Sequence, residues 1–300
     1  MSIQNELVKL VGSKNCSVNE PMKKHITFKV GGPASYYVTP DSVESLVDTI
    51  RYCKKAKLRY QIIGNGSNVL FTDKGYDGVV IEIGNKLSEV LVDNCVMIAG
   101  AGARLTKIAN EACKNGLSGL EFAAGVPGTV GGAVVMNAGA YGGEIKDIIV
   151  SAMVYDIDND KIITLGNGEL ELSYRNSILQ KKNYVLLEAC FELERGSENA
   201  IADKMKELNQ TRKDKQPLSY ASAGSTFKRP EGYYAGALIE ECGLKGYREG
   251  NARVSEKHAG FVVNIGNASA EDVINVINHV KETVRREKHV ELETEVKIIE

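Results

Sequence analysis

The sequence predicts an α+β fold of about two domains. Its 300 residues exceed what a single average domain holds. Short β-rich runs alternate with amphipathic helix patterns over the first 115 residues, and the β-rich runs between 148 and 193 follow one another without a helix between them. The second pattern is typical of an antiparallel sheet, so the chain combines two kinds of strand arrangement.

The first part of the chain supplies two predicted helices among its strands. The run 40–44 (PDSVE) offers a helix N-cap with an acidic residue three positions on. The buried stripe of this helix is formed by Leu46, Val47 and Ile50. A second helix is predicted over 105–115, ending before Gly116 as a helix-terminating glycine requires. Strands are predicted over 34–39, 60–63, 78–83 and 95–99.

The second part predicts a sheet, a boundary and a closing helix. Strands are expected over 148–156, 161–165, 184–193 and 290–299. A polar, charged helix over about 198–212 indicates a domain boundary. The last helix begins at Ser269 with Asp272 three residues later, which predicts a capping box. Its apolar residues recur at helical spacing: Val273, Ile274, Val276, Ile277, Val280 and Val284.

Composition narrows the function classes. The formal net charge is -2 with both signs interspersed, so there is no basic footprint for a nucleic acid or an anionic membrane. The six cysteines are widely spaced, with no CxxC pair, and are interpreted as reduced, mostly buried thiols. Residues 1–15 are too polar for a signal peptide, and no apolar run reaches membrane-spanning length. We expect a cytoplasmic enzyme or binding protein for a small or phosphorylated ligand.

A first glycine-rich loop, 64–68 (GNGSN), follows a predicted strand. Glycines let backbone N–H groups turn toward an anion without a Cβ in the way, and Ser67 and Asn68 add polar side chains. Segments of this kind are also common as plain turns. On these residues alone, both interpretations stay open.

A second stretch, 116–143, is much denser in glycine, with the run AGVPGTVGGA at 124–133 at its centre. Pro127 restricts one backbone dihedral while the neighbouring glycines allow close approach to a ligand, which suits a pyrophosphate on backbone amides. A tight chain crossing where only glycine fits is the alternative. The nine glycines are Gly116, Gly119, Gly125, Gly128, Gly131, Gly132, Gly139, Gly142 and Gly143.

Two familiar nucleotide motifs are missing. The GxGxxG pattern of a Rossmann dinucleotide site and the GxxxxGK[ST] pattern of a P-loop do not occur. A dinucleotide bound by this chain would therefore be held in another way.

Seven ordered motifs together resemble the UDP-N-acetylenolpyruvoylglucosamine reductase family over nearly the whole chain. They are TFKVGG at 27–32, GNGSNVL at 64–70, AGVPGTVGGA at 124–133, NAGAYG at 137–142, YRNS at 174–177, AGSTFK at 223–228 and LETEV at 292–296. The resemblance implies reduction of the enolpyruvyl double bond of UDP-N-acetylglucosamine enolpyruvate, with FAD and NADPH, to give UDP-N-acetylmuramate for peptidoglycan synthesis.

The resemblance also implies a fold and its boundaries. The family has an FAD-binding fold of the p-cresol methylhydroxylase and vanillyl-alcohol oxidase type, in two subdomains, followed by an α+β substrate-binding domain. The expected ranges are 1–86, 87–197 and 198–300. Longer family members insert a loop with a substrate-covering tyrosine before the third domain. Here the chain passes through 194–197 straight into a helix, as in the shorter branch.

Three catalytic residues carry over from the family motifs: Arg175, Ser225 and Glu295. Arg175 stays cationic and can offer two parallel donors to the pyruvyl carboxylate as charge develops there. Ser225 is the candidate acid that protonates C2, provided its surroundings stabilise the alkoxide. Glu295 would orient the enol hydroxyl, or share a proton in its protonated form, which requires a raised pKa in an enclosed site. Taken singly, each of the three is more commonly a surface charge or a turn residue.

The ligand contacts are also implied by the family motifs. The FAD contacts are expected at Gly64, Asn65, Gly66, Ser67, Asn68, Gly125, Val126, Pro127, Gly128, Thr129, Gly131, Gly132 and Gly139. Tyr141, Lys215 and Lys228 match substrate positions, although both lysines could be solvated surface residues. His25 and His258 have no companion at helical spacing, so no metal is predicted. No obligate protein partner is evident.

Two other functions compete with the reductase. A flavin oxidase of the same wider fold would use oxygen, and many such enzymes tether FAD through a histidine, which the glycine-rich regions here lack. A non-catalytic nucleotide-sugar sensor would keep the pocket without turnover. Reduction of bound flavin by NADPH without oxygen, followed by reoxidation on the enolpyruvyl nucleotide, separates the three.

Overall fold

The computed structural model describes residues 2–300 and divides into two compact units. Unit 1 comprises residues 1–18, 36–65 and 78–212, and unit 2 comprises residues 19–35, 66–77 and 213–300. Each unit is therefore built from separate stretches of the chain. None of the helices formed by residues 2–300 has the length and apolar character that crossing a bilayer demands.

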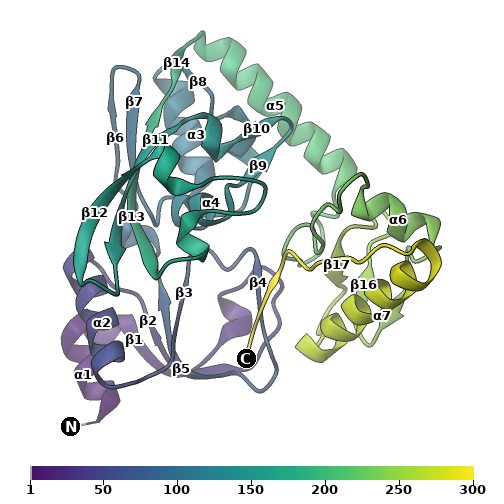
Figure 1. Cartoon of the computed structure of the whole chain (residues 1–300), viewed down its shortest axis with the longest axis horizontal. Helices are drawn as coiled ribbons and strands as arrows, with labels where there is room; N and C mark the ends of the chain where they lie inside the picture. The colour runs from purple at the N-terminus through teal and green to yellow at the C-terminus, as the bar shows by residue number, and fades with distance from the viewer. Residues whose placement is uncertain (1) are drawn as a thin grey trace. The chain divides into compact units, whose positions relative to one another are not determined.

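The N-terminal half of unit 1 combines two packed helices with a four-stranded sheet of order β1-β2-β5-β3 (Figure 1). The strands β3 and β5 are parallel, whereas β1, β2 and β5 contribute residues to both units. The elements are α1 (Ile3–Val11), β1 (Cys16–Pro21), β2 (Pro33–Val38), α2 (Val43–Lys55), β3 (Tyr60–Ile63) and β5 (Tyr76–Glu82). As predicted, Leu46, Val47 and Ile50 are buried on α2.

The rest of unit 1 is a five-stranded antiparallel sheet of order β12-β11-β13-β7-β6 with helices beside it (Figure 1). The elements are β6 (Val90–Asp93), β7 (Val96–Gly100), α3 (Leu105–Lys114), α4 (Val130–Met136), β11 (Ile149–Asp156), β12 (Lys161–Gly166), β13 (Tyr184–Glu192) and α5 (Glu198–Lys215). The sequence prediction missed the strand β6, which is only four residues long.

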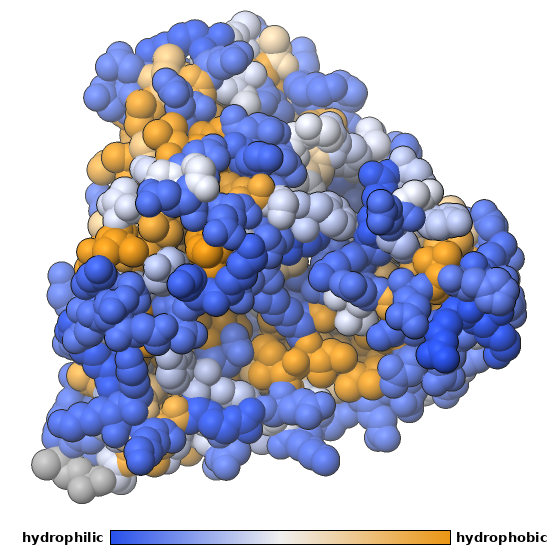
Figure 2. Space-filling view, viewed as in Figure 1, coloured by the Kyte–Doolittle hydropathy of each residue, from blue (hydrophilic) through white to orange (hydrophobic). Residues whose placement is uncertain are grey.

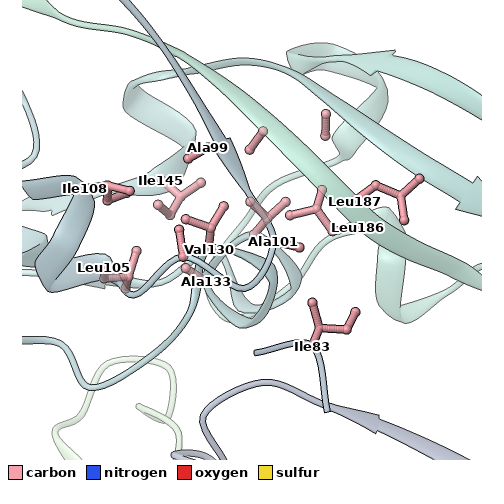
Figure 3. Close-up of a cluster of buried hydrophobic side chains, with 14 of the residues drawn as sticks. Ile83, Ala99, Ala101, Leu105, Ile108, Val130, Ala133, Ile145, Leu186 and Leu187 are labelled. Carbon is pink, nitrogen blue, oxygen red and sulfur yellow. The ribbon is translucent and has the colours of Figure 1, made fainter. Parts of the chain in front are cut away.

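The core of unit 1 lies where α3 and α4 meet the large sheet. Figure 3 shows Leu105 and Ile108 of α3 beside Val130 and Ala133 of α4, with Leu186 of β13 close by. All are buried. Figure 2 shows apolar surface over the five-stranded sheet, on a face that is otherwise mostly hydrophilic. The strands of this sheet also carry exposed apolar side chains, among them Leu91, Val150 and Ile162.

Unit 2 packs a three-stranded antiparallel sheet against a long helix (Figure 1). The elements are β4 (Val69–Phe71), α6 (Ala235–Glu241), β15 (Arg248–Glu249), β16 (Ala252–Val254), β17 (Val262–Asn264), α7 (Ala270–Lys288) and β18 (Lys297–Ile299). The predicted capping box is confirmed, since Ser269 accepts from the Asp272 N–H and the Asp272 carboxylate accepts from the Ser269 N–H.

Three sequence predictions need correction. The predicted strand over 290–299 is regular only over its last three residues, where β18 pairs in parallel with β4. At α2 the capping box is completed by Ser45 and not by an acidic residue. The cysteines are free, but four of the six are partly exposed, so the interpretation of mostly buried thiols was wrong. Only Cys53 and Cys113 are buried.

Candidate functional site

The two glycine-rich loops touch each other in unit 1. The first follows β3 directly, and a Cβ added at Gly64 would lie 2.2 Å from the Oγ1 of Thr129. The side-chain amide of Asn65 donates to the carbonyl oxygen of Pro127 at 2.6 Å. Glycine is therefore required at 64 by the close approach of the second loop. The residues predicted to hold one cofactor come from two loops that share contacts.

The second stretch leads into helix α4, and several of its backbone N–H groups already have partners. Val130 donates to Ala103, and Gly131 donates to Ala101. The N-cap Thr129 accepts from the N–H of Gly132 through its hydroxyl. Within residues 2–300, the N–H groups of Gly128 and Thr129 donate to no backbone carbonyl. These two amides are the donors that the second loop can offer an anion.

Other glycines of the stretch are explained by packing. A Cβ at Gly139 would lie 2.8 Å from the carbonyl oxygen of Gly143, and a Cβ at Gly143 would lie 2.7 Å from the ring of Phe122. Gly131 approaches the carbonyl of Ala101. Close packing therefore accounts for these three glycines, and ligand contact stays a prediction for the others.

Arg175 lies in a tight turn, residues 173–176, that we call the arginine turn. Ser173 and Asn176 exchange two backbone hydrogen bonds, of 3.1 and 3.0 Å. Arg175 has a φ of 53°, a left-handed conformation that normally favours glycine or asparagine at the third position of such a turn. Keeping a long charged residue there costs about 1–3 kcal/mol. This strain points to a functional reason for the arginine.

The C-terminal end of α4 holds the arginine turn in place. The buried hydroxyl of Ser177 and the amide of Gln180 both donate to the carbonyl oxygen of Val135, at 2.8 and 2.9 Å. The buried amide of Asn137 donates to the carbonyl of Ser173 at 3.2 Å. Helix α4 thus follows the second glycine-rich loop at one end and anchors Arg175 at the other.

Arg212 is a functional candidate that the sequence did not reveal. Its Cδ lies 2.6 Å from where a Cβ on Gly125 would be. Burial lowers the pKa of its guanidinium, while the nearby Tyr141 acts in the opposite direction. Within residues 2–300, no carboxylate pairs with this guanidinium. A half-buried cation without a counter-ion, beside a predicted cofactor loop and a predicted substrate tyrosine, is suited to an anionic ligand.

This cation was hidden in the sequence by its surroundings. Arg212 lies in α5 among many charged residues, where a solvated face is the ordinary interpretation. Tyr141 is 44% exposed and has a φ of 54°, a second left-handed residue among the predicted site residues. The left-handed backbone of Tyr141 is a property of the structure, and no pattern of neighbouring residues indicated it.

Unit 2 brings Ser225 and Glu295 together although they are 70 positions apart. The segments 224–228 and 293–297, which we call the serine–glutamate crossing, run side by side. The N–H of Glu295 donates to the carbonyl of Thr226, and the N–H of Lys228 donates to that of Glu293, both at 2.8 Å. Thr226 is fully buried, and its hydroxyl accepts from the N–H of Val262. Ser225 is thus one residue from a backbone contact with Glu295.

The predicted substrate lysines differ in their surroundings. Lys228 pairs with Glu293 at 2.9 Å, with both side chains exposed. Burial lowers the pKa of Lys297 on β18, and the positive charge of Lys228 lowers it further. Two cations therefore lie close together at the crossing, and Lys297 was not predicted. Lys215 is exposed at the end of α5.

The histidines occupy structural positions. His25 lies 3.0 Å from a carboxylate oxygen of Glu20. The Nδ1 of His258 accepts from the N–H of Gly260, and burial lowers the pKa of this imidazole. Among the side chains of residues 2–300, no group of three His, Cys, Asp or Glu could hold a metal ion.

Known proteins resemble this chain at the level of its two parts. The model of an FAD binding domain matches residues 34–166. The model of the C-terminal domain of UDP-N-acetylenolpyruvoylglucosamine reductase matches residues 216–299. These matches confirm the predicted α+β fold with an FAD-binding part and a C-terminal domain, and they confirm FAD as the cofactor.

Whole proteins match over almost their entire length. A UDP-N-acetylenolpyruvoylglucosamine reductase from Caldanaerobacter subterraneus is 52% identical over 94% of this chain and 93% of its own. One from Clostridium novyi is 51% identical over 100% of this chain and 97% of its own. The crystal structure of the corresponding reductase from Thermus caldophilus has a TM-score of 0.81 at 34% identity, covering 95% of this chain and 98% of its own.

Proposed function

This chain belongs to the UDP-N-acetylenolpyruvoylglucosamine reductase family of flavin-dependent oxidoreductases, and on that premise we propose the full reaction and its residues. The proposed reaction is NADPH-driven reduction of the enolpyruvyl double bond of UDP-N-acetylglucosamine enolpyruvate to UDP-N-acetylmuramate. Its proposed role is peptidoglycan precursor synthesis in the cytoplasm. The proposed domains keep the ranges 1–86, 87–197 and 198–300.

The residues of unit 1 fit an FAD molecule held by two loops. The first loop packs so closely on the second that a Cβ at Gly64 would collide with Thr129. Among residues 2–300 the backbone N–H groups of Gly128 and Thr129 have no backbone acceptor, and the guanidinium of Arg212 lies beside Gly125. Amides and a cation together suit the negative charge of a pyrophosphate. We assign the cofactor contacts to residues 64–67 and 125–132, because the side-chain amide of Asn68 is already bonded to the carbonyl oxygen of Glu295.

FAD supplies, when bound, the hydride that reaches C3 of the substrate after NADPH has delivered it. Hydride addition at C3 leaves charge developing on the pyruvyl carboxylate. Arg175 is proposed to stabilise that charge, since a guanidinium remains cationic and offers paired donors to planar oxygens. The strained backbone at Arg175 supports this role, because strain of that kind concentrates where geometry matters.

Protonation of C2 is assigned to unit 2. Ser225 is proposed to donate the proton, and Glu295 is proposed to orient the enol hydroxyl or to share a proton in its protonated form. The observation that carries this assignment is the hydrogen bond from the Glu295 N–H to the Thr226 carbonyl, which brings a hydroxyl and a carboxyl group onto neighbouring segments. The cations Lys228 and Lys297 lie at the same crossing and are proposed to meet the diphosphate, with Tyr141 and Lys215 as further substrate contacts.

The function is tested by following the flavin spectrum without oxygen. Purified protein should show an FAD spectrum that NADPH bleaches and that the enolpyruvyl nucleotide restores. A flavin restored equally by any UDP-sugar, or not bleached by NADPH, would contradict the reductase. Reoxidation by oxygen faster than by the nucleotide would favour an oxidase. Bound flavin without any turnover would favour a sensor.

A further inference from the structure

We propose that Asn68 is a positioning residue that fixes Glu295, and this inference rests on the proposed function of Glu295. Asn68 was expected among the cofactor contacts of the first glycine-rich loop. In the structure its side-chain amide donates to the backbone carbonyl of Glu295 at 3.1 Å, and the group is partly buried. A residue of the first glycine-rich loop therefore holds the segment just before β18, which carries the carboxyl group proposed for catalysis.

The bond replaces a missing step of a β-ladder. Strands β4 and β18 are parallel, with Lys297 opposite Val69, and the N–H of Lys297 donates to the carbonyl of Asn68 at 3.0 Å. In a regular parallel ladder, the next donor to the carbonyl of Glu295 would be the backbone N–H of Asn68. Here the side-chain amide of the same residue makes that bond. Asn68 thus extends the ladder by one step after the backbones diverge.

The other backbone group of Glu295 is held from the opposite side. Its N–H donates to the carbonyl of Thr226, next to Ser225. The backbone of Glu295 is consequently held by one hydrogen bond to the segment 224–228 and one to the first glycine-rich loop. Neither backbone group is left to water, so its Cα cannot move without breaking a bond to one of the two neighbours.

Thr27 links the same loop to the segment that precedes Ser225. The N–H of Thr27 donates to Gly66 at 3.1 Å, and its hydroxyl donates to the carbonyl of Ser222 at 2.6 Å. The loop at 66–68 is therefore linked to the segment before Ser225 through Thr27, and to the segment of Glu295 through Asn68. Asn68 has the more direct link, because it bonds the catalytic residue itself.

The sharpest variant is Asn68→Asp, which keeps the shape but replaces a donor by a carboxylate facing a carbonyl oxygen. We expect unchanged FAD content and flavin reduction by NADPH within about twofold, with reoxidation by the enolpyruvyl nucleotide slowed about tenfold or more, since small misplacements cost this much. Asn115→Asp is the matched control. Its amide also donates to a backbone carbonyl, that of Glu111 at 2.8 Å, on an exposed helix end.

Each outcome decides the proposal. Loss of FAD affinity with slowing of both half-reactions would make Asn68 a cofactor contact and overturn it, as would a normal reoxidation rate. Asn68→Ser serves as the second variant if Asn68→Asp fails to fold. Hydrogen exchange gives a readout independent of turnover: exchange across 294–297 should increase in both variants and stay unchanged in Asn115→Asp. Unchanged exchange across 294–297 in the Asn68 variants would refute the role of this bond. If the nucleotide does not reoxidise the flavin of the wild-type protein, the proposed function itself is refuted.

Discussion

The arginine turn and the serine–glutamate crossing present their catalytic residues in opposite ways. Arg175 is held by contacts from residues 135–180, most of them to the end of one regular helix. Ser225 and Glu295 are held by backbone bonds between irregular segments that are far apart in the chain. The first arrangement stores local backbone strain, whereas the second depends on long-range pairing. We therefore expect the loss of activity and the change in unfolding free energy to be related differently in the two regions.

The largest effect is expected for Ser225→Ala in the crossing. Losing the proton donor should slow reoxidation of the flavin by the nucleotide about 10²–10⁴-fold, because general acid catalysis contributes that much. Flavin reduction by NADPH should stay normal in anaerobic stopped-flow measurements. Ser219→Ala, at an exposed serine of the preceding segment, is the control. A normal second half-reaction would remove Ser225 from its role.

The next effect is expected for Arg175→Gly in the arginine turn. Reoxidation should slow about 10²–10³-fold, as when one preorganised donor group is removed. The free energy of unfolding should stay equal or rise by about 1 kcal/mol, since glycine relieves the left-handed strain and loses part of that gain through unfolded-state entropy.

Arg175→Lys is the matched variant for that test. Lysine keeps the positive charge and the backbone strain but loses the paired donors. It should therefore show intermediate activity and no gain in thermal stability. A glycine variant less stable than wild type, by calorimetry, would show that the turn is not strained.

Moderate effects are expected for the hydroxyls that support each region. Thr226→Val leaves the buried N–H of Val262 without an acceptor and should cost about 1–3 kcal/mol of unfolding free energy. Ser177→Ala should cost only about 1 kcal/mol, because Gln180 still donates to the carbonyl of Val135. Urea unfolding measures both, with Thr226→Ser as the rescue. Equal losses of unfolding free energy in Thr226→Val and Ser177→Ala would contradict the proposed difference between the two regions.

The smallest effect is a pH dependence at His258. Burial lowers the pKa of this imidazole in the folded protein, whereas the unfolded residue titrates near pH ~6.5. The unfolded chain therefore binds the proton more readily, and stability falls as the pH drops through ~6.5. Protonation would also break the bond from the Gly260 N–H, beside the crossing. The fall in Tm between about pH 7.5 and about pH 5.5 should be smaller in His258→Gln, and an equal fall would exclude this histidine.

Sequence patterns predicted the regular elements where local signals were strong. The capping box at Ser269 and the buried stripe of α2 are local features, read from residues three or four apart. The predicted strand over 290–299 was wrong over most of its length, because only Lys297–Ile299 pair with a neighbouring strand. Its hydrogen bonds go to Thr226 and to the side chain of Asn68, which no period of two can reveal.

The sequence by itself determined the family, the flavin cofactor and the α+β class, because ordered motifs and hydrophobic periodicity are properties of neighbouring residues. The tertiary structure decided which role each polar residue could take. It gave Asn68 a bond to Glu295, placed Arg212 beside Gly125 with no carboxylate partner among residues 2–300, and showed which glycines are required by close packing. These roles depend on distances between segments that lie far apart in the chain, and spacing along the sequence carries no record of those distances.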